Sequence, residues 1–168
     1  NIELSTKSTQ ECLNKMRQRG PDNQSIKKYQ HRGKSICYLL HSRLSIIDLN
    51  DRSNQPFEFN DITITYNGEI YNYLELRKQL ESVGYKFSTA SDTEVLIKSY
   101  HFWGENMFDK LEGMWSFAIY NRKTGRLILS RDRFAEKPLY YLKNRQGIYF
   151  GSEIKFIESL ISTCLLYT

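Results

Sequence analysis

Hydrophobic and polar residues alternate clearly near the centre of the chain. Ile62, Ile64 and Tyr66 are separated by single threonines, which is typical of a strand with one buried face. The pair Asn67-Gly68 then interrupts the alternation, as such a pair does in a turn at the end of a strand. The pattern therefore predicts a strand that ends at this pair.

A helix is predicted directly after this turn. Asn72 is its expected first residue, with Glu75 as the partner in a capping box. Apolar residues recur at helical spacing up to Gly84, a natural helix terminator. Residues 85–88 then have the composition of a second strand.

A second helix is predicted to begin in the segment Ser91–Glu94 and to end at Trp103-Gly104. The same reading predicts the remaining elements: a helix over residues 9–16, strands over residues 35–40, 113–120, 126–130 and 148–151, and a last helix capped by Ser152. Strands and helices that follow one another in this way are compatible with an α+β fold and with a parallel α/β sheet.

Two polar clusters occupy junctions between a predicted strand and a predicted helix. They are Asn67–Glu69 and Ser91–Glu94. Such junctions present side chains and free backbone N–H groups to a ligand. Asn-Gly is also common in plain turns, and Ser-Asp-Thr-Glu in plain helix caps. The pattern alone favours these structural roles and leaves a binding role open.

Composition narrows the class of protein. The 168 residues are 40% hydrophobic and 14% aromatic, as in a globular domain. The net charge of +5 is scattered, which argues against a basic module that binds nucleic acid. No apolar run of membrane-spanning length and no signal-peptide pattern is present, so we expect a cytoplasmic protein with no membrane partner. Cys12, Cys37 and Cys164 fit neither a disulfide framework nor a metal site.

Short motifs along nearly the whole chain point to one family. In order they are RGPD (19–22), HSRLSIIDL (41–49), NQP (54–56), YNGEIYNYLELRKQL (66–80), FSTASDTEVLIKSY (87–100), GMWSFA (113–118), RDRFAEKPLYY (131–141) and FGSEIK (150–155). Together they resemble the glutaminase domain of glutamine-hydrolysing asparagine synthetases, a class II glutamine amidotransferase. The nine-residue match at 41–49 is specific, whereas RGPD in isolation means little.

The resemblance implies an α+β fold, the four-layer αββα sandwich of N-terminal nucleophile hydrolases. It implies a domain that releases ammonia from L-glutamine for the ATP-dependent amidation of aspartate or a related acceptor. ATP and magnesium are then expected in the family's synthetase domain, the main partner, and no cofactor or metal in this domain. A homodimer is compatible with this reading.

The resemblance also assigns roles to five residues. Arg43 forms a bidentate pair with the α-carboxylate of glutamine, and Asp92 takes its α-ammonium group. The Asn67 amide and the Gly68 N–H are the catalytic donors of an oxyanion hole. Glu69 lines the same pocket. Arg43 and Asp92 are expected to converge on one cavity of amino-acid size.

His41, in the same motif as Arg43, is expected to be a satisfied polar residue of a strand and not a catalyst, because the class II mechanism requires no histidine side chain. Ala135 departs from the family, which has glycine at this position. If φ is positive there, alanine costs roughly 1 kcal/mol.

The family's nucleophile is an N-terminal cysteine whose own α-amino group acts as the base. None of the three cysteines has that context. We therefore expect residues 1–168 to be one amidotransferase type 2 domain without the family's cysteine strand and synthetase domain. The alternative is a catalytically silent domain that serves as a structural partner of a synthetase domain, and a third reading is a basic binding module.

The expected consequence is that residues 1–168 alone do not hydrolyse glutamine, whereas the chain extended by its native N-terminus does. Ammonia release from the two proteins measures this. Equal activity in both would make another residue, such as Cys12, the nucleophile.

Overall fold

The computed structural model describes residues 3–33, 35–44 and 50–161. In chain order its elements are α1 (Thr6–Met16), β1 (Asn23–His31), β2 (Ser35–Arg43), a 3-10 turn (Asp51–Ser53), β3 (Phe57–Phe59), β4 (Ile62–Ile70), α2 (Tyr73–Ser82), α3 (Asp92–Trp103), a 3-10 helix (Gly104–Lys110), β5 (Gly113–Asn121), β6 (Arg126–Arg131), β7 (Tyr140–Lys143), β8 (Ile148–Gly151) and α4 (Ile154–Leu160). Within these ranges no helix is long and apolar enough to cross a membrane.

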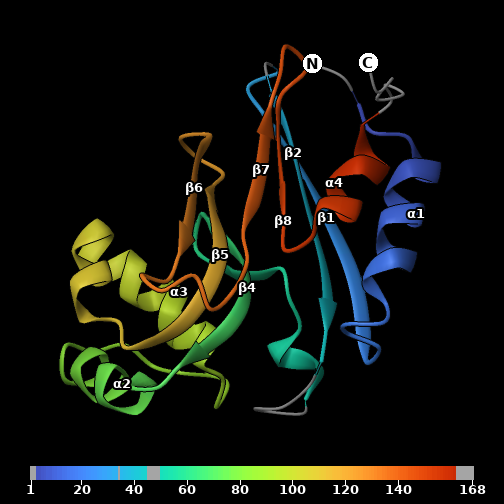
Figure 1. The fold of residues 1–168 in the computed structure, drawn as a ribbon. Helices are drawn as coiled ribbons and strands as arrows, with labels where there is room; N and C mark the ends of the chain where they lie inside the picture. Colours follow the sequence, from blue (N-terminus) through green and yellow to red (C-terminus); the bar gives the residue numbers. More distant parts are fainter. Residues whose placement is uncertain (1–2, 34, 45–49, 162–168) are drawn as a thin grey trace.

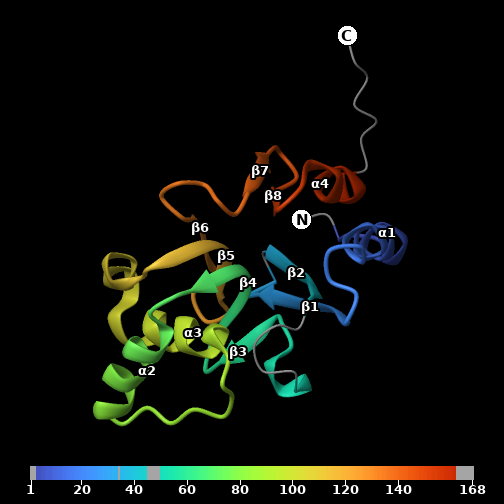
Figure 2. The ribbon, with the colours of Figure 1, turned by 60° about the horizontal axis from the view of Figure 1, so that its bottom comes forward.

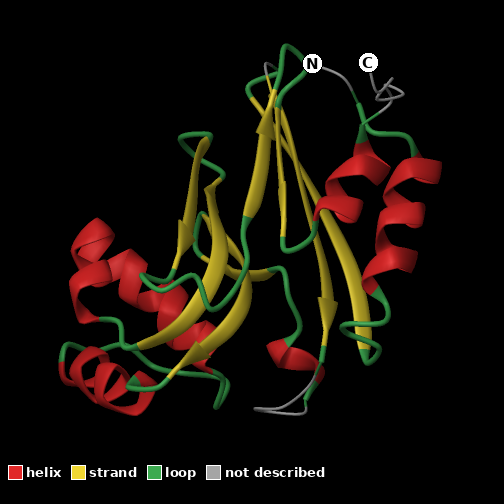
Figure 3. Ribbon diagram, in the orientation of Figure 1, coloured by secondary structure: helices red, strands yellow, loops and turns green. Residues whose placement is uncertain are grey.

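Helices enclose two layers of antiparallel strands (Figures 1 and 3). One layer is a sheet in the order β3-β4-β5-β6, and the other contains the hairpins β1–β2 and β7–β8. Helices α2 and α3 cover the outer face of the sheet, while α1 and α4 pack together beyond the hairpins (Figure 2). The order helix, strand, strand, helix is the expected αββα arrangement, and the parallel alternative is wrong.

Strand β4 is buried on both of its faces. Ile64 is fully buried in the core beneath α2 and α3. Thr63, expected on an exposed face, is equally buried, and its hydroxyl donates to the Tyr29 hydroxyl of β1 at 3.1 Å. The second strand layer therefore covers the face for which the alternation predicted exposure.

The pair Asn67-Gly68 does not end the strand, contrary to the prediction. β4 runs on to Ile70, with Gly68 opposite Trp115 of β5. A Cβ added at Gly68 would lie 2.2 Å from the Met114 carbonyl oxygen, so glycine is required by this close approach. The strand continues because β5 provides a partner along its whole length.

The segment 85–88 is not a strand, also contrary to the prediction. It is attached to α3 by the Glu94 carboxylate, which accepts backbone N–H bonds from Ser88 at 3.0 Å and from Thr89 at 2.7 Å. Lys98 donates to the Lys86 carbonyl and pairs with Glu94, at 2.5 Å in each case. These backbone groups are satisfied by side chains, so the segment needs no neighbouring strand.

Two of the three predicted caps, at Asn72 and Ser152, are not formed. The Asn72 side chain makes no capping bond in α2; it donates to the Lys110 carbonyl at 2.8 Å and accepts from the Glu112 N–H at 3.1 Å. Helix α4 begins after Glu153 and not at Ser152, again without a side-chain cap. Ser91 does cap α3, accepting from the Thr93 N–H at 3.1 Å. Strands β1, β3 and β7 were not predicted.

The loop after β6 is organised around the buried carboxylate of Asp132. It accepts N–H bonds from Phe134, Glu136 and Lys137, each at 3.0 Å. Burial alone would raise the pKa of Asp132, but these donors outweigh it and lower the pKa. The loop backbone is thus fixed with Ala135 at φ 59°, the left-handed region.

Replacing Ala135 by glycine should raise the free energy of unfolding by about 1 kcal/mol, because alanine is strained at positive φ. Urea unfolding at neutral pH measures the change. Ala90, which has no positive φ, provides the matched control, and Ala90→Gly should lower stability. A loss of stability in both variants would contradict the inferred backbone strain at Ala135.

Candidate active site

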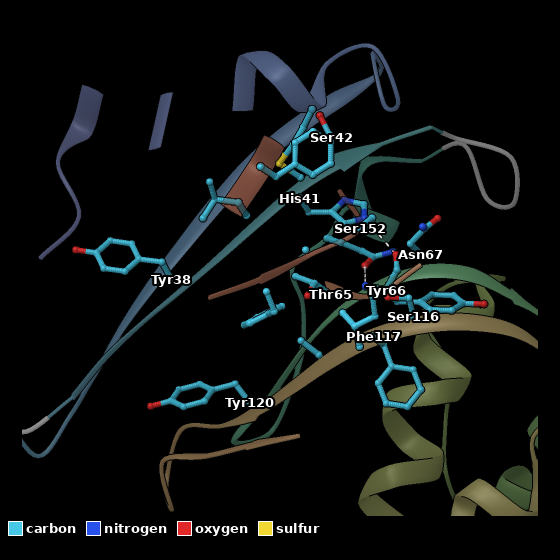
Figure 4. A pocket seen from close by; sticks show the side chains of 18 of the residues that line it. Tyr38, His41, Ser42, Thr65, Tyr66, Asn67, Ser116, Phe117, Tyr120 and Ser152 are labelled. Carbon is cyan, nitrogen blue, oxygen red and sulfur yellow. Dashed lines mark hydrogen bonds between the residues drawn. The ribbon is translucent and has the colours of Figure 1, made fainter. Parts of the chain in front are cut away.

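A cavity of about 770 Å³ lies between the two strand layers. Five of its lining residues are the ones that the sequence singled out: Arg43, Asn67, Gly68, Glu69 and Asp92. They come from β2, β4 and the start of α3. Figure 4 shows part of this cavity, with His41 of β2 next to Tyr66 and Asn67 of β4.

Arg43 ends β2 and is 6% exposed. Its backbone carbonyl accepts from the Asp22 N–H at 3.1 Å, and Gly20 packs on the preceding Ser42 carbonyl, where a Cβ would lie at 2.2 Å. Its Nη1 donates to the Asn54 side chain at 2.8 Å and to the Asn50 carbonyl at 3.1 Å. The RGPD and NQP motifs therefore orient this arginine. Residues 45–49 of its own motif lie outside the described residues.

The backbone N–H of Gly68 faces away from β5. Trp115 lies opposite on β5 but bonds to Asp132. The Trp115 carbonyl accepts from the Asp132 N–H at 2.8 Å, and the Trp115 N–H donates to the Asp132 carboxylate at 3.3 Å. Two residues before and after Gly68, the N–H groups of Tyr66 and Ile70 are bonded to the side chains of Gln55 and Asp92. Because N–H groups two apart in a strand share a side, we infer that the Gly68 donor points from this same edge into the cavity.

Asp92 is the first residue of α3 and is 6% exposed. Its Oδ2 accepts from the Tyr66 hydroxyl at 2.8 Å and from the Ile70 N–H at 3.2 Å. Burial raises the pKa of Asp92, the nearby Glu69 adds to the rise, and the hydrogen bonds oppose it. A helix N-terminus also favours the ionised form. The hydrogen bonds therefore fix the direction of the Asp92 carboxylate but only partly offset the cost of burying its charge.

Arg43 and Asp92, 49 positions apart in sequence, thus border one cavity with little exposure to bulk solvent. Opposite charges at one cavity suit a zwitterionic ligand such as an amino acid. Glu69 lies at the exposed side of the same cavity.

His41 is satisfied on one side only. Its Nε2 lies 3.2 Å from the Tyr66 carbonyl oxygen, so this nitrogen carries the proton, and the buried Nδ1 has no partner among the described residues. Burial lowers its pKa to about 4, and the Arg43 charge contributes. A neutral His41 thus links β2 to β4, and the expectation of a satisfied polar residue holds for its Nε2 but not for its Nδ1.

The cysteines of the described part are not suited to nucleophilic attack. Burial raises the pKa of Cys12 to about 11 and that of Cys37 to about 12, so both are neutral thiols near pH 7. Cys12 is fully buried. Cys164 lies outside the described residues.

Sequence reasoning missed Tyr66 and Gln55 as site residues. Gln55 Oε1 accepts from the Tyr66 N–H at 2.6 Å, and its Nε2 donates to the Thr93 hydroxyl at 3.4 Å. A buried tyrosine hydroxyl needs a polar partner, and this was the available signal for Tyr66.

Comparison with known proteins agrees with this geometry. The family model of the glutamine amidotransferase domain matches residues 2–165. The chain belongs to this family. Asparagine synthetase [glutamine-hydrolyzing] 1 of Bacillus subtilis is 42% identical over 156 residues, covering 89% of this chain and 24% of that protein. A putative asparagine synthetase [glutamine-hydrolyzing] 2 of Methanocaldococcus jannaschii is 39% identical over 167 residues, covering 88% and 32%.

This amidotransferase domain spans about a quarter to a third of the length of these relatives. Among solved structures, the glutamine phosphoribosylpyrophosphate amidotransferase of B. subtilis superposes with a TM-score of 0.77. The superposition covers 95% of this chain and 42% of that one, at 20% identity. This likeness confirms the fold, which is the expected N-terminal nucleophile hydrolase type.

The buried neutral His41 predicts a loss of stability in mild acid. Its pKa is about 4 in the folded state against 6.5 ordinarily, so the unfolded state binds more protons between these values. This contribution to stability is complete above pH 6.5 and is lost as the pH falls towards 4. Between pH 7.5 and 5 the loss should be about 2 kcal/mol.

Urea unfolding of the wild type and of His41→Gln at both pH values measures this loss, which the variant should lack. The control variant His101→Gln, which removes an exposed histidine, should still show this loss of stability. Equal pH dependence in the wild type and His41→Gln would refute the assignment.

Proposed function

We propose that this domain hydrolyses L-glutamine and supplies the ammonia to an ATP-dependent synthetase part of a longer protein. The observation that carries the proposal is the single cavity bordered by Arg43, Asp92 and the Asn67-Gly68 pair. It offers a cation, an anion and a backbone donor to one ligand.

Binding uses the two buried charges. The Arg43 guanidinium pairs with the α-carboxylate of glutamine, and the Asp92 carboxylate pairs with its α-ammonium group. An α-amino acid engages both charges, whereas a simple amide engages neither, and this favours the amino acid. Glu69 borders the amino-acid end of the pocket.

Hydrolysis needs a thiolate that attacks the side-chain amide carbon. In this family we expect it from an N-terminal cysteine, which deprotonates through its own α-amino group. The carbonyl oxygen becomes an oxyanion that accepts bonds from the Gly68 N–H and the Asn67 amide. Ammonia leaves with a proton from the amino group, and water then cleaves the thioester to release glutamate and regenerate the thiol.

The fate of the ammonia follows from the relatives. Those reported above are named as glutamine-hydrolysing asparagine synthetases and are three to four times longer than the matched region. We infer that the ammonia amidates aspartate or a related carboxylate in a synthetase domain, where ATP and magnesium would act. A cytoplasmic location suits these substrates, and self-association into a homodimer is compatible with the proposal.

Asn67→Ala in the full-length protein should reduce kcat for glutamine hydrolysis about 100-fold, with a smaller change in KM, because the amide acts mainly on the transition state. Ammonia release with glutamine as the varied substrate gives both constants. Asn14→Ala, on the exposed face of α1, is the control and should resemble the wild type. An unchanged kcat in Asn67→Ala would remove this residue from the oxyanion hole.

A further inference from the structure

Tyr66 is held at three of its atoms. Its N–H donates to Gln55 Oε1 at 2.6 Å, its carbonyl accepts from His41 at 3.2 Å, and its hydroxyl donates to Asp92 Oδ2 at 2.8 Å. Tyr66 is 5% exposed and immediately precedes Asn67 in the sequence. Tyr66 thus contacts β2 through His41 and the start of α3 through Asp92, and it is the neighbour in sequence of the Asn67-Gly68 pair.

We propose that Tyr66 is a positioning residue for glutamine: its hydroxyl aims the Asp92 carboxylate at the α-ammonium group of the substrate. The proposal rests on the proposed function and deepens it. With Oδ2 occupied by Tyr66 and by the Ile70 N–H, the ammonium group is met by Oδ1. The same bond ties the binding end of the site to the strand that carries the oxyanion donors.

The hydrogen bond from Tyr66 affects the ionisation of Asp92. Burial raises the pKa of Asp92, and the Tyr66 hydroxyl is the foremost of the contacts that lower it. Burial and the Asp92 charge also raise the pKa of Tyr66, so the phenol stays a donor throughout the neutral range. The other ionisable side chains that line the cavity include Glu69, Arg43, His41, Arg19 and Lys137, and the Glu94–Lys98 pair lies further along α3.

Removal of the Tyr66 hydroxyl should shift the pKa of Asp92 in a direction that can be measured. Without it the pKa of Asp92 rises further, and a smaller fraction of Asp92 is ionised at a given pH. Glutamine binding needs the ionised form, so affinity falls, and it falls most on the acidic side. A residue that only fills space would not move this pH profile.

The experiment compares Tyr66→Phe with Tyr29→Phe in the full-length protein. Tyr29 is the matched control, since its hydroxyl also donates to a carboxylate, that of Glu58, at 2.7 Å, but it does not line the cavity. Ammonia release between pH 5.5 and 8.5 gives kcat and KM, calorimetry gives glutamine affinity, and thermal unfolding checks the fold.

We expect Tyr66→Phe to raise KM about tenfold at pH 7, with kcat within about twofold, from the loss of a hydrogen bond to a charged group. The pH at which KM begins to rise should move upward by about one unit. Tyr29→Phe should keep the wild-type KM and pH profile.

Two results would overturn the inference. One is a Tyr66→Phe variant with wild-type KM and pH profile; the other is equal losses in both variants that follow their thermal stability. If the wild type binds glutamine without hydrolysing it, the proposed function fails, while a shifted binding profile in Tyr66→Phe still supports the role of Tyr66. If the wild type does not bind glutamine, both fail.

Discussion

The site depends on the edge that β4 exposes where β3 ends. The pairing of β3 with β4 stops at Ile64, yet β4 continues to Ile70. Backbone N–H groups on the remaining edge are buried in the structure and need acceptors. Gln55 satisfies Tyr66 and Asp92 satisfies Ile70, and the Gly68 donor between them is directed at the cavity. The proposed oxyanion donor, the Gly68 N–H, is thus one position of an interrupted ladder.

Two buried charges of opposite sign, Arg43 and Asp92, border the same cavity as this edge. Asp92 is held by the Tyr66 hydroxyl and the Ile70 N–H, and the contacts of Arg43 include the Asn54 amide and the Asn50 carbonyl. These neutral partners orient the Asp92 carboxylate without neutralising it, so a ligand with an ammonium group still gains from binding it. The raised pKa of Asp92 expresses this incomplete compensation. Under the proposed function, an α-amino acid brings an ammonium group to Asp92 and a carboxylate to Arg43 at once.

The start of α3 is kept in place by a buried ion pair that does not line the cavity. Glu94 and Lys98 pair at 2.5 Å, and Lys98 lies over the rings of Phe59 and Phe87. Burial would raise the pKa of Glu94, but Lys98 and the donors of Ser88 and Thr89 lower it below its usual value. The pair therefore stays charged, and Asp92 begins a helix whose preceding loop is fixed.

The sequence by itself determined the strand from Ile62, the helices, the β5–β6 hairpin and, through family motifs, the five residues at the cavity. Local patterns suffice for these, because alternation, caps and turns depend on neighbours within a few positions. Tertiary structure decided that β4 passes through Asn67-Gly68, that 85–88 is a loop, and that Tyr66 joins His41, Gln55 and Asp92. Those links span 25, 11 and 26 positions, so only the packing of two strand layers brings the partners together.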